Sequence, residues 1–248
     1  MTAPVWRPLP GEQRLLVSPA WFVLVDDHRG RAYDSGPLVV RLDRWDGRDW
    51  TPDPARAVRT PSGVVAYPGL GRRREPANAE PVLHRVRLEA PGYRVLYTPD
   101  DHLDRFAADV IGREFLAYPF DDVTPPEVTA EPEVVRLLPG VAYPYTPGTR
   151  VIAGLVRRAG SGEPLAGVLV TAEGRTDPEG LPWRERTLTG ESGAFRLALR
   201  WAGESATTTP AAELFQLTAA ERPGRTGRLT VRLPDERDRV HVIEISGE

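Results

Sequence analysis

The sequence contains no cysteine and no lysine. Without cysteine, neither a disulfide bond nor a thiolate metal site can form. All 32 positively charged side chains are therefore arginines. A GC-rich genome would explain this usage, but arginine also favours two-pronged contacts with carboxylates, which suits it to protein interfaces.

The sequence also lacks long apolar runs and a marked excess of charge. No stretch approaches the roughly 18 apolar residues of a membrane-spanning helix, and Met1 to Gly11 shows neither the apolar core nor the cleavage site of a signal peptide. The net charge is -3, which gives no basic footprint for nucleic acid or an anionic membrane. We therefore expect a cytoplasmic protein with neither of these partners.

Proline and glycine are abundant, with 26 and 23 residues scattered among apolar runs. This distribution predicts many short strands joined by frequent turns. Apolar and polar residues alternate with a period of two in several segments: 38–43, 85–89, 195–200 and 228–233. Each segment is typical of a strand with one buried face and one arginine-rich face in water.

One stretch, Asp100 to Phe115, predicts a helix, because an acidic cap precedes apolar residues at helical spacing. The proline-rich run Thr124 to Pro132 predicts an exposed connector, and Val134 to Tyr145 predicts an extended strand. The expected organisation is an N-terminal extension, a first sandwich, the helix with its connector, and a second sandwich: 1–17, 18–98, 99–150 and 151–248.

The two halves of the chain show a weak repeat. Ser62-Gly63 and Ser192-Gly193 occupy corresponding turns, and each half then has a strand that ends at Pro-Gly, at Pro91-Gly92 and Pro223-Gly224. Glycine at such turns supplies a positive φ at little steric cost. A chance alignment of β-rich sequence is the alternative explanation.

Residues 151 to about 199 carry three motifs in order. The first is I-x-G-x-V at Ile152, Gly154 and Val156; the second is GEPLAGVLV, residues 162–170; the third is TGESGAFRL, residues 189–197. Together they resemble the carboxypeptidase regulatory-like (prealbumin-like) domain family, although Gly190 stands where that family usually has aspartate. The resemblance implies a β-sandwich of transthyretin or immunoglobulin type. The segments 175–186, with Trp183, and 202–212 depart from it and are interpreted as elaborated loops.

With this resemblance, the predicted fold class is all-β: two small antiparallel β-sandwiches joined by a short helix and a proline-rich connector. The family accompanies peptidases, receptors, adhesins and particle components, so it implies a fold and no single activity. The run LLPGVAYPYTPGTRVIAGLV, residues 137–156, is also similar to linkers in proteins of phage-tail-like contractile injection systems.

Several candidate chemical sites have simpler structural explanations. His241 and Glu244 have the first part of a zinc-carboxypeptidase spacing, but they lie on a predicted strand, where residues three apart face opposite ways. Asp26-Asp27-His28 and Asp100-Asp101-His102, with Asp104, could bind a cation. The first segment is better explained as a turn, where aspartate is common, and the second as a helix start, where carboxylates cap free backbone N–H groups. Ser62 and Ser192 lack a nucleophile motif, and Gly69 to Arg72 reads as a lone turn. We predict no enzyme, and no catalytic, cofactor or metal site.

Two groups of residues are candidate interfaces. Arg72, Arg73 and Arg74 form a basic cluster that is either a solvated hairpin loop or a contact for an acidic partner. Trp45, Trp50, Trp183 and Trp201 fall in predicted loops or at strand ends. Exposed tryptophan is enriched at binding hot spots, but tryptophan also closes the ends of small sandwich cores, and both roles stay open.

The hypothesis for function is a non-catalytic structural or adaptor protein. Its partners would be protein subunits of a larger assembly, including copies of itself. The assembly suggested by the linker similarity is a phage-tail-like contractile injection particle, with the chain near its cap, collar or baseplate. The alternative is a β-sandwich module that binds a carbohydrate or a peptide.

Overall fold

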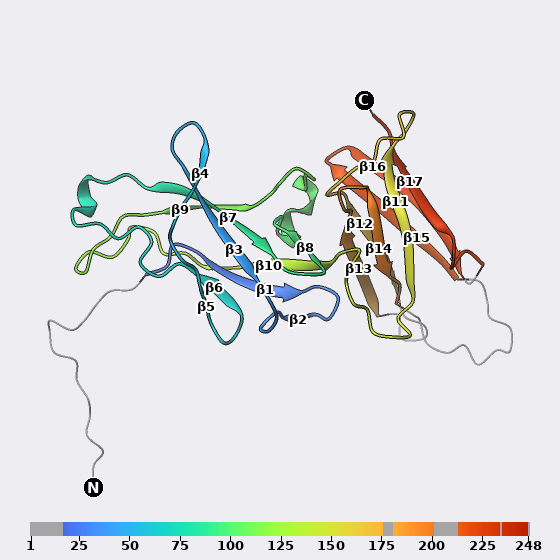
Figure 1. Cartoon of the computed structure of the whole chain (residues 1–248), viewed down its shortest axis with the longest axis horizontal. Coiled ribbons are helices and arrows are strands. Elements are labelled where there is room, and N and C mark those ends of the chain that lie inside the picture. The colour runs from blue at the N-terminus through green and yellow to red at the C-terminus, as the bar shows by residue number, and fades with distance from the viewer. Residues whose placement is uncertain (1–16, 176–180, 201–212, 234, 248) are drawn as a thin grey trace, which may run out of the picture. The chain divides into compact units, whose positions relative to one another are not determined.

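The computed structural model describes residues 17–175, 181–200, 213–233 and 235–247 (Figure 1). Within these residues strands predominate, and helix is confined to two short 3-10 segments, η1 (Pro76–Asn78) and η2 (Asp100–Arg105). The all-β prediction is confirmed. The expected N-terminal extension lies outside the described residues except for Val17.

Internal contacts divide the chain into two units of three segments each. The first comprises Met1–Val23, Val40–Arg87 and Gly112–Glu133, and the second comprises Leu24–Val39, Leu88–Ile111 and Val134–Glu248. The domain limits expected from the sequence stay a prediction.

Residues 21–139 supply the strands of two sheets. The larger has the order β5-β6-β1-β10-β8, with β2 also paired to β1; the smaller has the order β4-β3-β7-β9. Their strands are β1 (Trp21–Asp26), β2 (Arg31–Ala32), β3 (Val39–Trp45), β4 (Trp50–Pro52), β5 (Val58–Arg59), β6 (Val64–Ala66), β7 (Val82–Glu89), β8 (Tyr93–Leu96), β9 (Arg113–Ala117) and β10 (Pro132–Pro139). The strand expected over 134–145 is confirmed for residues 134–139, which belong to β10, but β10 begins two residues earlier and ends at Pro139, so residues 140–145 are not part of a strand.

Residues 151–245 supply two further sheets, in the orders β14-β11-β17 and β13-β12-β15-β16. Their strands are β11 (Val151–Arg158), β12 (Leu169–Arg175), β13 (Pro182–Leu188), β14 (Ala194–Ala198), β15 (Glu213–Arg222), β16 (Arg225–Leu233) and β17 (Val240–Ile245). The pairing of β11 with β17 is parallel, whereas β11 pairs with β14 in the antiparallel sense.

The glycine turns predicted from the sequence are present. Gly63, Gly92, Gly193 and Gly224 all have positive φ, between 72° and 83°. Gly92 lies in the turn between β7 and β8, and Gly224 lies in the turn between β15 and β16. A residue with a side chain would be strained at a positive φ. Glycine therefore lets the chain turn after β7 at Pro91-Gly92 and after β15 at Pro223-Gly224.

The motif I-x-G-x-V forms the middle of β11. Ile152 and Val156 are buried, while Gly154 lies directly opposite Phe195 of β14. A Cβ atom at Gly154 would lie 2.4 Å from the Phe195 ring and 2.5 Å from the carbonyl oxygen of His241. The absence of a side chain at this position therefore lets the Phe195 ring lie across the sheet.

The predicted helix over 100–115 is shorter than expected. Its first six residues form η2, in which His102 already departs from helical geometry (φ -124°). From Arg113 the chain forms β9, whose Phe115 is buried opposite His84 of β7. Pairing with β7 satisfies the hydrogen-bonding groups of the β9 backbone and at the same time buries the Phe115 side chain. This tertiary gain overrides a local helical pattern; Val110 and Ile111 of the expected apolar stripe are exposed.

The interpretation of 175–186 as an elaborated loop was wrong for Arg175 and for residues 182–186, whereas residues 176–180 lie outside the described residues. β12 continues to Arg175, and β13 begins at Pro182 and pairs with β12 along its whole length. Four consecutive residues of β13, from Glu185 to Leu188, are buried. A strand buried on both faces has no alternating pattern for the sequence to reveal. The segment 202–212 lies outside the described residues.

Each unit has its own core. In the first, the Phe115 ring contacts Phe22, Tyr67 and His84, with ring centroids 5.7 to 5.9 Å apart. In the second, the largest buried cluster joins the sheets of residues 151–245 and contains Ile152, Val156, Phe195, Leu217, Val231 and Ile243. A smaller cluster in the same unit contains Leu96, Phe106, Leu138, Leu169 and Leu188.

Candidate functional site

Trp45 and Trp50 form a cross-strand pair at the end of the β3–β4 hairpin, whose loop projects at the top of Figure 1. Their ring centroids are 5.3 Å apart with an interplanar angle of 58°, and both side chains are half-buried. The Asp46 N–H donates to the Asp49 carbonyl (3.2 Å). The tryptophans are therefore a non-hydrogen-bonded pair, the arrangement in which opposing side chains lie closest.

The hairpin loop is held by its own backbone. The Asp46 carboxylate accepts hydrogen bonds from the N–H groups of Arg48 (2.9 Å) and Asp49 (2.8 Å), and Gly47 takes φ 100°. These hydrogen bonds from Asp49 and Arg48 lower the pKa of Asp46. The loop therefore positions the two tryptophans before any partner binds, which reduces the entropy lost on binding.

Arg85 of β7 completes this surface. Its guanidinium carbon lies 4.4 Å from the centroid of the Trp50 ring, a cation–π contact. Its Nε and Nη2 donate to Oδ2 of Asp43 (3.3 and 3.1 Å), and Arg87 donates to Oδ1 (2.8 Å). We call Trp45, Trp50 and Arg85 the tryptophan surface. The sequence identified the tryptophans but assigned Arg85 and Arg87 to a solvated face.

Asp43 is buried, although strand alternation placed it on the polar face. Burial alone would raise the pKa of Asp43, but hydrogen bonds and charges from Arg87 and Arg85 outweigh it and hold the pKa below its ordinary value. Asp43 thereby fixes the guanidinium of Arg85 over the Trp50 ring, so this buried carboxylate helps to position the tryptophan surface.

Asp43→Asn is expected to lower the free energy of unfolding by about 2 kcal/mol at pH 7, because charge-assisted hydrogen bonds are lost. Since the folded pKa of Asp43 is depressed, its contribution is fully present above the ordinary carboxyl pKa of about 3.9 and disappears as pH falls through the lower folded pKa. Denaturant unfolding across this range checks the prediction. Asp49→Asn is the matched control, because Asp49 is 76% exposed; an Asp43→Asn effect that persists unchanged in strong acid would contradict the assignment.

The arginine cluster is only partly available. Arg72 pairs with Asp122 and forms a β-bridge with Phe120, and the Arg73 N–H donates to the Phe120 carbonyl (2.8 Å). The side chains of Arg73 and Arg74 are exposed. The cluster is thus an anchored loop with two outward charges, and the structure does not bring it together with a second feature that points to a ligand.

The other two candidate tryptophans are Trp183 and Trp201. Trp183 is 9% exposed, and its ring lies 6.0 Å from that of Phe215 in the main core of the second unit. Of the two roles left open for the tryptophans, Trp183 has the core role. Trp201 lies outside the described residues.

The acidic–histidine segments do not converge on a cation. Asp26 accepts hydrogen bonds from Tyr93 (2.7 Å) and the Arg29 N–H (3.0 Å), while His28 Nδ1 lies 2.9 Å from a Glu185 oxygen. Asp100 does not cap η2 as expected, because its carboxylate is engaged with arginines. Among the described residues, no group of three or more histidine and acidic side chains is arranged to hold a metal.

Arg186 is one of the most deeply buried charges among the described residues of the second unit. Its side chain is 1% exposed, and its Nε and Nη2 donate to the two carboxylate oxygens of Asp27 (3.0 and 2.5 Å). Its Nη1 donates to Asp100 (2.6 Å). Arg136 also contacts the carboxylates of Asp27 and Asp100 (3.2 and 2.5 Å). Two arginines and two aspartates therefore neutralise one another, which makes this a structural network rather than a reactive site.

His241 and Glu244 lie on β17 with opposite orientations, as predicted. His241 is buried, while Glu244 pairs with Arg157 (2.7 Å) near the surface. The two side chains cannot share a metal ion.

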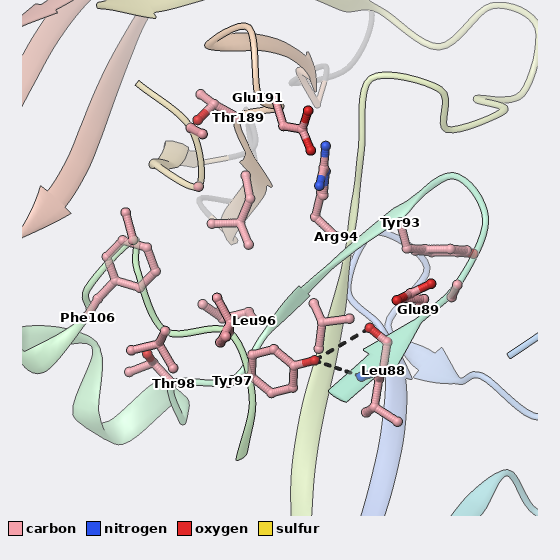
Figure 2. Close-up of a pocket in the computed structure, with 18 of the residues that line it drawn as sticks. Leu88, Glu89, Tyr93, Arg94, Leu96, Tyr97, Thr98, Phe106, Thr189 and Glu191 are labelled. Atoms are coloured by element: carbon pink, nitrogen blue, oxygen red, sulfur yellow. Dashed lines mark hydrogen bonds between the residues drawn. The ribbon is translucent and has the colours of Figure 1, made fainter. Parts of the chain in front are cut away.

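A cavity of about 480 Å³ lies within the second unit (Figure 2). Its walls come from the end of β7, from β8, from the segment 98–111 and from the turns at 166–167 and 188–191. The buried wall residues include Leu88, Leu96, Phe106 and Leu188. This volume is within the usual range of ligand sites. No sequence signal could identify the cavity, because its walls come from three distant stretches of chain.

The polar groups of the cavity are few. The Tyr97 hydroxyl accepts a hydrogen bond from the Leu88 N–H (2.8 Å) and donates to the Leu88 carbonyl (3.5 Å). Arg94 and Glu191 point toward one another at one end (Figure 2). No histidine, serine or aspartate is among the described residues that line it. This composition is suited to binding apolar groups and provides no nucleophile–base pair.

No family model matches the chain, and no curated protein matches it. Among solved structures, it is similar to a streptococcal ancillary pilin with 9% identity and a TM-score of 0.26 over 94% of this chain, and this chain spans 62% of that pilin. It is also similar to a DUF3823 family protein from Bacteroides uniformis (9% identity, TM-score 0.30, 93% of this chain and 96% of that chain). A third similarity is to a candidate adhesin from Bacteroides ovatus (11% identity, TM-score 0.22, 100% of this chain and 94% of that chain). No conclusion about function follows from similarities at this level.

Neither of the two 3-10 segments in the described part of the chain is long and apolar enough to cross a membrane.

Proposed function

We propose that this chain is a non-catalytic β-module of a multi-subunit assembly and that the tryptophan surface is a contact with a protein partner. The observation that supports this most directly is the half-buried Trp45–Trp50 pair, with the Arg85 guanidinium over the Trp50 ring. Tryptophan and arginine are the residue types that dominate binding hot spots. Here both are held in place by Asp43 and by the hairpin loop, so a partner would meet an ordered surface.

Trp45→Ala is expected to weaken binding to that partner about 30-fold, which corresponds to about 2 kcal/mol and is typical of a hot-spot tryptophan. The partner is first isolated from the native host with the full chain as bait, and its affinity is then measured by surface plasmon resonance. Arg48→Ala is the matched control, since its side chain is 92% exposed in the same loop. Wild-type affinity in Trp45→Ala, with the fold intact by circular dichroism, would refute the proposed contact.

A glycan- or peptide-binding role is the second candidate, and the same half-buried tryptophan pair favours it, because aromatic rings also stack on sugars. Fluorescence titration with soluble glycans and peptides separates the two. Saturable binding of a glycan that is lost in Trp45→Ala would favour ligand recognition, whereas a defined large complex in native mass spectrometry would favour assembly.

We propose a phage-tail-like contractile injection particle, assembled in the cytoplasm, as the first assembly to test. The support is the sequence similarity of residues 137–156 to linkers in such systems and the resemblance of residues 151–199 to carboxypeptidase regulatory-like modules. Recovery of sheath, tube or baseplate subunits with the bait would support this assignment. Recovery of a partner unrelated to such particles would remove the assignment and leave the binding role to be tested by Trp45→Ala.

A further inference from the structure

β8 is the edge strand of its sheet, and its hydrogen-bonding direction follows from its register with β10. Residues 93 to 96 of β8 pair with residues 139 to 136 of β10, and the Gly140 N–H donates to the Gly92 carbonyl (2.8 Å). Hydrogen-bonded pairs alternate in an antiparallel ladder. The backbone groups of residues 94 and 96 therefore point toward β10, and those of Val95 point away from it.

The outward N–H and C=O of Val95 have no backbone partner among the residues that the structure describes. The register itself is supported from the other side of β10, where the Asp27 N–H donates to the Leu137 carbonyl (3.1 Å). An unpaired edge of this kind is a template for an added extended strand. The opposite edge of the same sheet is β5, which has only two residues.

The apolar cavity adjoins this edge. Tyr93, Arg94, Val95 and Leu96 all line it, and Figure 2 shows Arg94, Leu96 and Tyr97 around it. Its lining also includes apolar side chains that remain in water: Val39 (48% exposed), Val110 (46%) and Ile111 (58%). Because alternate side chains of a strand point to the same face, a strand added to β8 would place every second side chain in or beside the cavity.

The charged residues of the lining suggest the sign of the occupant. They are Glu89, Arg94 and Glu191, which together carry a formal charge of -1. Arg94 and Glu191 face each other at one end (Figure 2), and the lining also contains the apolar rim residues Val39, Val110 and Ile111. An occupant with apolar side chains and a basic residue would match this arrangement.

We propose that the edge of β8 and the adjoining cavity bind an extended segment of a partner protein, with alternating apolar side chains and a basic residue. The segment pairs with the Val95 N–H and C=O and buries its apolar side chains against Leu96, Phe106 and Leu188. This site lies in the second unit and uses backbone pairing, so it is distinct in place and chemistry from the tryptophan surface of the first unit.

Val95→Pro tests the pairing directly. Proline is tolerated on edge strands where its missing N–H would face outward, and the Val95 N–H does not serve the β10 ladder. Peptides are selected from a random library on the full wild-type chain, and the affinity of each enriched peptide is then measured by fluorescence anisotropy. Enriched peptides should carry alternating apolar residues and a basic residue. Their binding should weaken at least about tenfold in Val95→Pro and stay unchanged in Val95→Ala, which retains the N–H.

Two further measurements keep the result clear. Ile111→Asp, at an exposed rim position, should also weaken the selected peptides, and N-methylation of the peptide amide opposite Val95 should abolish binding to the wild-type chain. Thermal unfolding establishes that each variant is folded; if Val95→Pro is not, the N-methylated peptide alone decides.

Several outcomes would overturn the proposal. The first is that no peptide is enriched. The second is that the enriched peptides bind the Val95→Pro variant as tightly as they bind the wild-type chain. A third is a hydrophobic dye whose binding depends on Ile111 but not on Val95, which would assign the cavity to small apolar molecules. A fourth is that the Val95→Pro variant, without any peptide, sediments differently from the wild-type chain, which would assign the edge of β8 to pairing with a second copy.

Discussion

Arg186→Leu is expected to lower the free energy of unfolding by about 3 to 5 kcal/mol, the range found when one partner of a buried ion pair is removed. The leucine leaves Asp27, whose side chain is 8% exposed, without its two-pronged partner. Arg136 retains one contact with Asp27 at 3.2 Å, so compensation is partial. For a chain of this size the loss corresponds to a fall in melting temperature of about 10 °C.

The matched control is Arg184→Leu, two residues earlier on the same strand. The Arg184 side chain is 40% exposed and lies 3.7 Å from Asp100, so its removal should cost less than about 1 kcal/mol. The double variant Arg186→Leu with Asp27→Leu should recover part of the loss, because it removes the buried uncompensated charge as well. Equal melting temperatures for Arg186→Leu and Arg184→Leu would show that the network does not stabilise the fold.

Gly154→Ala is expected to cost about 3 kcal/mol. Its added methyl group meets the Phe195 ring at 2.4 Å and the His241 carbonyl oxygen at 2.5 Å, and the second of these belongs to the backbone of a paired strand. Either Phe195 leaves its position in the core or β11 separates from β17. Overpacking of a filled core usually costs about 1 to 3 kcal/mol, and more where backbone must move.

Gly190→Ala provides the control for Gly154→Ala. It is the same substitution in the same sheet pair, but the nearest atom, Nη2 of Arg94, lies 3.5 Å from the added carbon and belongs to a flexible side chain. Its effect on stability should be below about 1 kcal/mol. Denaturant unfolding of the three proteins, with near-ultraviolet circular dichroism for Phe195 packing, measures both effects. Indistinguishable midpoints for the two variants would show that the close approach at Gly154 is relieved without cost.

Local patterns in the sequence were sufficient for the fold class. Alternation revealed β14 and β16, and Pro-Gly revealed the turns at Gly92 and Gly224, because both signals depend on residues close in the chain. The spacing of Trp45 and Trp50 around Asp46 to Asp49 also predicted their loop, which the structure confirms as a hairpin.

What the sequence could not reveal depends on partners far along the chain. Arg186 pairs with an aspartate 159 residues away, and Asp43 is buried by arginines more than 40 residues away. A charged residue on a strand is normally in water, so pattern analysis placed Arg85 and Arg87 there. The same limitation applies to β13, where burial on both faces removes the alternation. It also applies to β8, because its register with β10 decides which backbone N–H and C=O groups point outward.

The parallel pairing of β11 with β17 has a consequence for synthesis of the chain. The paired residues Arg157 and Glu244 are 87 positions apart. At translation rates of about 5 to 20 residues per second, β11 waits roughly 4 to 17 s on the ribosome for its partner. During that interval one of its edges is open to pairing with other nascent chains. The yield of soluble protein should therefore depend on translation speed and chaperone supply, even where the finished molecule is stable.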